Sequence, residues 1–137
     1  MADQERENTV LLVDDDRPIR EGLRRFFDGT SYRVAGEAAD GMAAVALCRK
    51  LRPDLVLLDV KMPLLNGIDA ARLIREERSA RCIVMLTSFD DQSCVEQALA
   101  AGAAGYLTKP LRAEDILPTL ELCLSHTKEY YLLEKNC

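Results

Sequence analysis

The chain has 137 residues, about the length of one ordinary domain, and a net charge of −5. Apolar residues make up 48% and charged residues 30%, a globular balance that excludes a disordered or collagen-like chain. No apolar run approaches the roughly 20 residues of a transmembrane helix, so we expect no membrane contact. Because the composition shows no basic stripe, we also expect no direct nucleic-acid binding by this chain.

The cysteines and the N-terminal residues indicate a compartment. Five cysteines are an odd number, and no two form a C-x-x-C pair. The opening M-A-D-Q-E-R-E-N is polar and acidic and lacks the regions of a signal peptide. We therefore expect a cytoplasmic chain with free thiols.

Strand and helix patterns alternate along the chain. Short apolar runs predict strands at residues 10–13, 32–38, 55–58, 83–86 and 104–107. Helical patterns follow each strand and begin near residues 17, 41, 68, 92 and 113. We expect Asp16 to cap the first helix, and Met42, Val45 and Ala46 to form the inner face of the second.

Five successive β-then-α units predict an α/β fold. The expected architecture is a single doubly wound, five-stranded parallel sheet flanked by five helices, the last of them extended. The run 55–58 is apolar on both faces, as a strand covered by helices on both sides requires. In such sheets the ligand binds at the carboxyl ends of the strands, near the point where strand order reverses.

Polar side chains follow four of the five predicted strands. They are Asp14, Asp15, Asp16, Asp59, Thr87, Ser88 and Lys109. Since parallel strands end at one edge, we expect three carboxylates, a hydroxyl and an ammonium around one shallow cleft.

These groups predict a phosphoryl-transfer site. Neighbouring carboxylates repel one another unless a cation is present, and hard oxygen ligands suit Mg²⁺. A Lys and a Thr can hold an anion, and phosphoryl transfer depends mainly on positioning and charge neutralisation. The sequence has no Gly-rich phosphate loop, so we expect the phosphoryl group on an Asp, as an acyl phosphate.

Four motifs occur in a characteristic order: L-L-V-D-D-D, L-V-L-L-D-V-K-M-P-L-L-N-G, V-M-L-T-S and G-Y-L-T-K-P. Over about residues 8–125 the chain resembles the receiver domain of two-component response regulators. The resemblance implies the flavodoxin-like receiver fold, with an N-terminal tail at 1–7. Residues 126–137 would form a helical C-terminal extension, or a linker to an effector that is absent here.

The resemblance also implies a role for each acid. Asp59 would accept the phosphoryl group from a sensor histidine kinase. Mg²⁺ (or Mn²⁺) would be held by Asp14, Asp15, Asp59 and the backbone carbonyl of Lys61. The chain would then be a phospho-acceptor signalling domain and not an enzyme, apart from its own phosphorylation and dephosphorylation.

The remaining motif residues would form a switch. Lys109 would hold a phosphate oxygen, Thr87 with Ser88 would turn onto the phosphate, and Tyr106 would move inward. The resemblance also implies a cis peptide between Lys109 and Pro110. These movements would bias the partner surface around the fourth helix, fifth strand and fifth helix.

Two positions are expected to tune the site. Lys61 places a cation two residues after Asp59. Phe89, two residues after Thr87, is bulky and apolar, and we expect it to restrict the attacking water and slow loss of the phosphoryl group.

The last predicted helix suggests an output. Leu117, Leu120, Leu124 and Tyr131 fall near heptad spacing, and residues 130–133 lie beyond the expected core. This pattern favours a homodimer seam or a linker over packing on the same domain. The stretch from residue 83 to residue 122 looks most like receivers of antitermination (ANTAR-type) regulators, which implies a parent protein acting in transcription or RNA antitermination.

Three functions are compatible with these residues. The first is the phospho-acceptor module, either joined to an effector or standing alone and acting by protein–protein contact. The second is a phosphohydrolase with an aspartyl-phosphate intermediate, which would need an acid where Lys61 stands. The third is a receiver-shaped scaffold that never takes phosphate, but such a scaffold usually lacks one of the five key residues. All five are present here: Asp14, Asp15, Asp59, Thr87 and Lys109.

Overall fold

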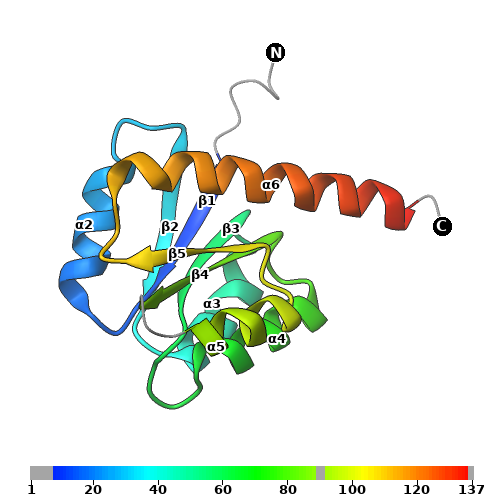
Figure 1. The fold of residues 1–137 in the computed structure, drawn as a ribbon, viewed down its shortest axis with the longest axis horizontal. Helices are drawn as coiled ribbons and strands as arrows, with labels where there is room; N and C mark the ends of the chain where they lie inside the picture. The colour runs from blue at the N-terminus through cyan, green and yellow to red at the C-terminus, as the bar shows by residue number, and fades with distance from the viewer. Residues whose placement is uncertain (1–7, 89–91, 136–137) are drawn as a thin grey trace.

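The structure, a computed structural model, describes the backbone of residues 8–88 and 92–135 and the side chains of residues 8–88 and 93–127. Five β/α units follow one another in these ranges (Figure 1). The strands are β1 (Asn8–Val13), β2 (Tyr32–Ala38), β3 (Leu55–Asp59), β4 (Cys82–Ser88) and β5 (Gly105–Lys109). The helices are α2 (Arg17–Phe27), α3 (Gly41–Leu51), α4 (Gly67–Glu77), α5 (Gln92–Ala100) and α6 (Ala113–Lys135).

The sheet has the order β2-β1-β3-β4-β5, and every neighbouring pair is parallel. The chain runs outward from β1 to β2 and then returns to β3 on the other side of β1. Strand order therefore reverses between β1 and β3, whose carboxyl ends form the crevice expected for ligands. The predicted doubly wound parallel sheet is confirmed.

Two apolar layers hold the sheet between its helices. Alternate residues of β1, β3 and β4 pack with α3, α4 and α5 on one face and with α2 and α6 on the other (Figure 1). All five residues of β3 are buried, which explains the unbroken apolar run at residues 55–58 that precedes Asp59. The four cysteines of the described side chains, Cys48, Cys82, Cys94 and Cys123, are free thiols, as predicted.

Two predictions about helix faces and caps are wrong. Met42 is 60% exposed and Ala46 is exposed, whereas Val45 is buried as expected, beside Ala44 and Cys48. Small residues surround the true inner face, so the apolar pattern alone did not single it out. Asp16 occupies the N-cap position of α2, but its side chain makes no capping hydrogen bond.

The strands also extend further than predicted. Thr87 and Ser88 end β4, and Lys109 ends β5, so these residues lie within the sheet ladder and not after it. Ladder pairing places Thr87 opposite Thr108 and Ser88 opposite Lys109. Backbone pairing therefore fixes the carboxyl ends of β4 and β5 relative to each other.

The α6 helix packs on its own domain over its first half. Leu120 and Leu124 are buried and Leu117 is partly buried in the layer under α2 and α6. The expectation that they form a seam for a partner is therefore wrong, because the sheet face already covers them. The helix continues through Pro118 to Lys135 and projects beyond the sheet (Figure 1). The side chains of residues 130–133 are not among those that the structure describes.

Within the described residues, no helix has the length and apolar character needed to span a bilayer.

Candidate functional site

An acidic cluster lies at the carboxyl ends of β1 and β3, where strand order reverses. Asp14 directly follows β1, and Asp59 is the last residue of β3. One carboxylate oxygen from each of Asp14, Asp15 and Asp59 lies within 4.8 Å of the others. Asp14 and Asp59 are buried and Asp15 is exposed, so the cluster is open on the Asp15 side. The three acids named from the sequence thus meet in one cluster.

Asp14 is fixed on several sides. Its backbone N–H donates to the carbonyl of Ala38 at 3.1 Å, which ties it to the end of β2. Its Oδ1 accepts from the backbone N–H of Asp16 at 2.9 Å. Asp14, and not Asp16, therefore supplies the side-chain acceptor at the start of α2.

Asp59 lies deep enough for its protonation to be affected. Burial raises the pKa of its carboxyl to about 6, with Asp14 adding repulsion and Lys109 opposing it. The backbone N–H of Lys61 also donates to Oδ1 of Asp59 at 3.3 Å. At neutral pH the carboxylate is thus ionised, but burial and the nearby Asp14 destabilise its charge. A divalent cation would stabilise that charge.

Lys109 places a cation beside the acidic cluster. Its Nζ lies 2.7 Å from Oδ2 of Asp14 and 3.5 Å from Oδ2 of Asp59. Burial alone would lower the pKa of Lys109, but the two carboxylates raise it overall. One ammonium therefore faces several carboxylates, and the remaining negative charge fits a hard cation such as Mg²⁺ on the open Asp15 side.

The predicted switch residues lie beside the cluster in different environments. Thr87 is buried, and its hydroxyl makes only a long 3.4 Å contact to the carbonyl of Ser88. Tyr106 is 43% exposed, and its inward movement on phosphorylation stays a prediction. The Lys109–Pro110 peptide is cis, as predicted. Phe89 lies outside the described residues.

The loop from Val60 to Asn66 is tied down at both ends beside Asp59. Val60 donates its N–H to the carbonyl of Leu86 at 3.0 Å, and Gly67 donates to the carbonyl of Val60 at 2.8 Å. A Cβ atom on Gly67 would overlap the carbonyl oxygen of Asp59. Gly67 was not singled out from the sequence, although the Asn-Gly pair before a helix is a turn signal that points to it.

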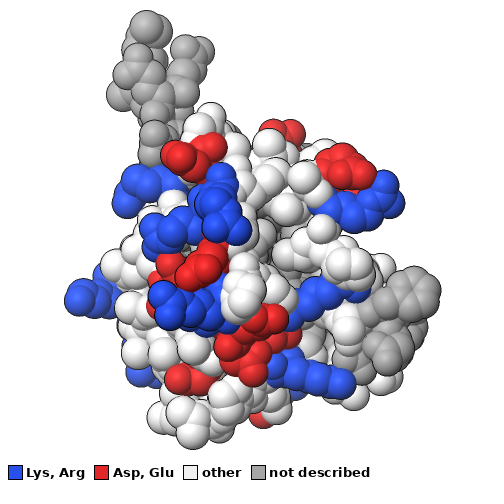
Figure 2. Space-filling view, turned by 90° about the vertical axis from the view of Figure 1, so that its left-hand side faces the viewer, with Lys and Arg blue, Asp and Glu red and all other residues white. Residues whose placement is uncertain are grey.

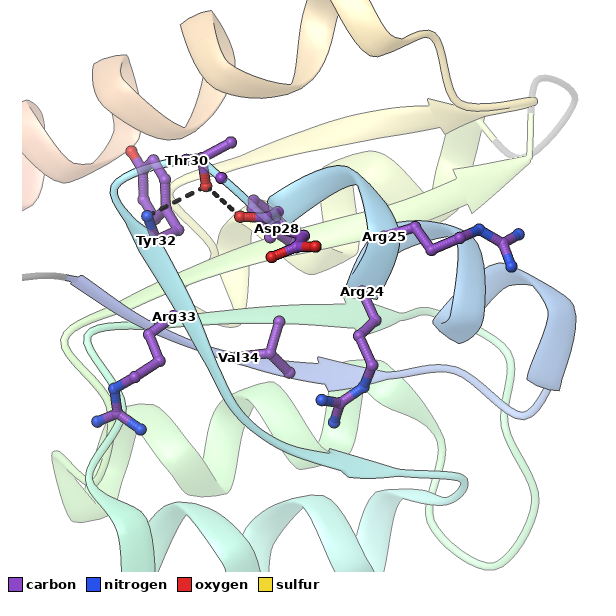
Figure 3. Close-up of a pocket in the computed structure, with 9 residues that line it drawn as sticks. Arg24, Arg25, Asp28, Thr30, Tyr32, Arg33 and Val34 are labelled. Carbon is purple, nitrogen blue, oxygen red and sulfur yellow. Dashed lines mark hydrogen bonds between the residues drawn. The ribbon is translucent and has the colours of Figure 1, made fainter.

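Among the cavities outside the acidic cluster, two are lined in part by residues of α2. One, of about 510 Å³, lies between α2 and β2 and is lined by Arg24, Arg25 and Arg33. In Figure 3 these three guanidinium groups lie apart from one another, so they do not converge on one ligand. The other, of about 420 Å³, is a mostly apolar groove between α2 and α6 that ends at Lys109 and Pro110.

Comparison with known proteins gives a consistent picture. Residues 10–121 match the family described as the response regulator receiver domain. The transcriptional regulatory protein PdtaR of Mycobacterium tuberculosis is 44% identical over 125 residues, which cover 91% of this chain and 60% of PdtaR. Protein CcdB of Bacillus subtilis is 38% identical over 117 residues, covering 85% of this chain and 98% of CcdB.

Solved structures agree with these sequence matches. A two-component response regulator of the LuxR family from Aurantimonas has a TM-score of 0.79 and 34% identity, covering 88% of this chain and 86% of its own. The chemotaxis protein CheY4 of Vibrio cholerae has a TM-score of 0.76 and 33% identity, covering 84% of this chain and 97% of its own.

Proposed function

Because the chain belongs to the family of response regulator receiver domains, we propose that it takes a phosphoryl group from a histidine kinase onto Asp59. The single observation that carries this proposal is the arrangement of Asp14, Asp15, Asp59 and Lys109 around one pocket. The family acts in signalling, and the proposed chemistry here is acceptance of a phosphoryl group by the protein itself.

The transfer needs an ionised nucleophile and charge neutralisation. A carboxylate oxygen of Asp59 attacks phosphorus as the phosphorus–nitrogen bond to the donor imidazole breaks, which leaves an acyl phosphate and a neutral imidazole after protonation. With its pKa near 6, Asp59 is mostly ionised at neutral pH. Lys109 lies 3.5 Å from Asp59 and is placed to donate a hydrogen bond to a phosphoryl oxygen.

We propose that Asp14, Asp15 and Asp59, with the backbone carbonyl of Lys61, hold Mg²⁺ or Mn²⁺. When bound, the ion would neutralise the developing charge on the phosphoryl oxygens. The carboxylates supply hard oxygen donors, and the exposed side of Asp15 leaves room for the water molecules that Mg²⁺ retains. The proposal of a metal site rests on the oxygen atoms that these residues can offer as ligands.

We further propose that Thr87 and Ser88 at the end of β4, with Tyr106, Lys109 and Pro110 on or directly after β5, form the switch. The new group adds nearly two negative charges and three acceptor oxygens. Buried Thr87 has only a weak hydroxyl contact to give up, so a phosphoryl oxygen would be a better partner. Lys61 and Phe89 are proposed to tune the phosphate lifetime.

The domain boundaries and the output are also proposals. We place the receiver at residues 8–125, between a tail at 1–7 and a helical extension at 126–137. The chain spans 60% of the length of its relative PdtaR, whose name describes a transcriptional regulatory protein. This relationship is consistent with a parent protein that regulates transcription, by an ANTAR-type or another effector. A cytoplasmic location and the absence of nucleic-acid contact by this chain stay predictions.

One experiment tests the proposed transfer. The protein is incubated with Mg²⁺ and a small phosphodonor, and its intact mass is measured. We expect one phosphoryl group per chain, lost in Asp59→Asn and retained in Asp28→Asn, whose carboxylate lies at the far end of α2. Absence of any adduct would favour a scaffold, and turnover of external phosphoesters would favour a phosphohydrolase.

A further inference from the structure

Arg20, on α2, joins the acidic cluster to β2. Its Nη1 donates to the backbone carbonyl oxygen of Asp14 at 2.6 Å, and its Nε donates to Oε1 of Glu37 at 3.1 Å. Only 16% of its side chain is exposed. A guanidinium can make both contacts at once because its donors form a rigid planar fork.

Glu37 is itself held from two sides. Its Oε2 accepts from Nε of Arg24 at 2.7 Å, in addition to the contact with Arg20. Burial opposes the charge of Glu37, but the two arginines lower its pKa overall. Figure 2, which views the side of the molecule where α2 lies, shows basic and acidic side chains next to one another on this face. Arg20 is therefore anchored at its outer end by an ionised partner.

The contact with Asp14 has a consequence for Asp15. The carbonyl oxygen of Asp14 belongs to the peptide plane that ends at the Cα atom of Asp15, and this plane is rigid. The N–H of Asp14 is already fixed by Ala38, and its carboxylate by Asp16 and Lys109. The hydrogen bond from Arg20 thus fixes the peptide that joins the two consecutive acids.

We propose that Arg20 is a positioning residue of the metal pocket: it orients the Asp14–Asp15 peptide so that these carboxylates meet Asp59. This inference rests on the proposed function, in which the three acids bind Mg²⁺. Within the described residues, the Arg20 side chain hydrogen-bonds to Glu37 and to the Asp14 carbonyl but not to Asp59, the proposed phosphoryl acceptor. Residues that orient metal ligands in this way typically change metal affinity by about 10-fold or more when removed.

A purely structural role for Arg20 predicts a different pattern. Arg20 also connects α2 to β2 through Glu37, and loss of that connection would loosen the edge of the sheet. Arg24 makes the same connection to Glu37, but within the described residues its guanidinium forms no hydrogen bond to Asp14. The Arg20→Met and Arg24→Met variants are therefore a matched pair, because both weaken the α2–β2 link and only the first releases the Asp14–Asp15 peptide.

The test measures Mg²⁺ binding and phosphorylation separately. Mg²⁺ alone is titrated into wild type and each variant by calorimetry, and the rate of phosphorylation by a small phosphodonor is then measured at several Mg²⁺ concentrations. We expect Arg20→Met to weaken Mg²⁺ binding about 10-fold and to recover most of its rate at saturating Mg²⁺. Arg24→Met should bind within about 2-fold of wild type, and Arg20→Lys should lie between wild type and Arg20→Met, since one ammonium cannot span both partners.

The outcomes distinguish this inference from the proposed function. Equal Mg²⁺ affinities for wild type and Arg20→Met, or equal losses in Arg20→Met and Arg24→Met, would overturn the positioning role while phosphorylation of wild type stands. A wild type that neither binds Mg²⁺ nor takes phosphate would overturn both. If Arg20→Met does not fold, as judged by circular dichroism, Arg20→Lys decides: weaker binding than wild type supports the inference, and equal binding contradicts it.

Discussion

The ammonium nitrogen of Lys109 lies 2.7 Å from Oδ2 of Asp14, closer than its 3.5 Å distance to Asp59. Lys109 is therefore paired mainly with an acid that is proposed to bind metal. A phosphoryl group on Asp59 would compete for the same ammonium, and a bound divalent ion would replace it beside Asp14. In the proposed function, this ion pair would link metal binding to the freedom of Lys109 to hold phosphate.

Lys109→Met should destabilise the protein by about 2–4 kcal/mol without Mg²⁺, because it leaves the buried carboxylate of Asp14 without its cation. Mg²⁺ should restore part of this loss by supplying charge to the same carboxylates. Urea unfolding with and without Mg²⁺ measures both effects. The exposed Lys50 of α3 offers a control, and an equal effect of Lys50→Met would contradict the explanation.

The raised pKa of Asp59 predicts an unusual pH dependence. Its pKa of about 6 in the folded protein exceeds its ordinary unfolded value of about 4, so the folded state holds the proton more tightly between these values. The contribution of Asp59 to stability is then fully present below about pH 4 and is lost as the pH rises through 6. Asp59→Asn should thus be more stable than wild type at pH 7–8 without Mg²⁺, by about 1–2 kcal/mol after allowance for solvent screening.

Thermal unfolding of wild type and Asp59→Asn across pH 4–8 checks this dependence. The gap between the two curves should widen with pH and shrink when Mg²⁺ is added to wild type. Glu76→Gln, which removes an exposed carboxylate of α4, provides the comparison. A gap that stays constant from pH 4 to 8 would contradict the role of burial at Asp59.

Gly67→Ala should disturb the site through the backbone of Asp59. The added Cβ atom would overlap the Asp59 carbonyl oxygen, so the loop between them must open. We expect a loss of at least about 2 kcal/mol in unfolding free energy and slower phosphorylation. Gly22→Ala is the matched control, since nothing lies within 4 Å of its added Cβ atom in α2 and it should stabilise the protein by about 0.5–1 kcal/mol.

The last helix offers a test of its packing. Leu120 is completely buried and Leu122 is 61% exposed on the same helix. Leu120→Ala should cost about 2–5 kcal/mol, whereas Leu122→Ala should cost less than about 0.5 kcal/mol. Urea unfolding and light scattering measure stability and oligomeric state together. If Leu120→Ala instead dissociated a dimer with little loss of monomer stability, the buried position of Leu120 would be contradicted.

Much of the fold could be predicted because the local patterns are strong and agree with one another. The unbroken apolar run of β3 requires cover on both faces. Five strands that alternate with helices then predict a parallel sheet with helices on both sides. The site followed from the same logic, since Asp14, Asp59 and Lys109 lie at strand ends that parallel order brings to one edge. The motifs L-L-V-D-D-D and G-Y-L-T-K-P then indicated the family that the comparisons confirm.

Helix faces and partner surfaces were less predictable. The face of α3 was misassigned because a run of Met, Ala and Val is apolar on every side, so periodicity could not choose Ala44 over Ala46. The heptad spacing of Leu117, Leu120 and Leu124 suits a partner helix and a sheet face equally well. A homodimer through the last helix stays a prediction without support from these buried side chains.

The sequence by itself determined the order of elements, the family and the residues that carry the proposed chemistry, because each depends on local composition and on the parallel order of strands. Only the tertiary structure decided that Lys109 pairs more closely with Asp14 than with Asp59, that Arg20 joins Asp14 to Glu37, and that Gly67 touches the backbone of Asp59. These relationships join residues from different elements across distances that are set by packing. No spacing along the chain can report them, because side-chain reach and loop closure are fixed only once the sheet and helices have packed together.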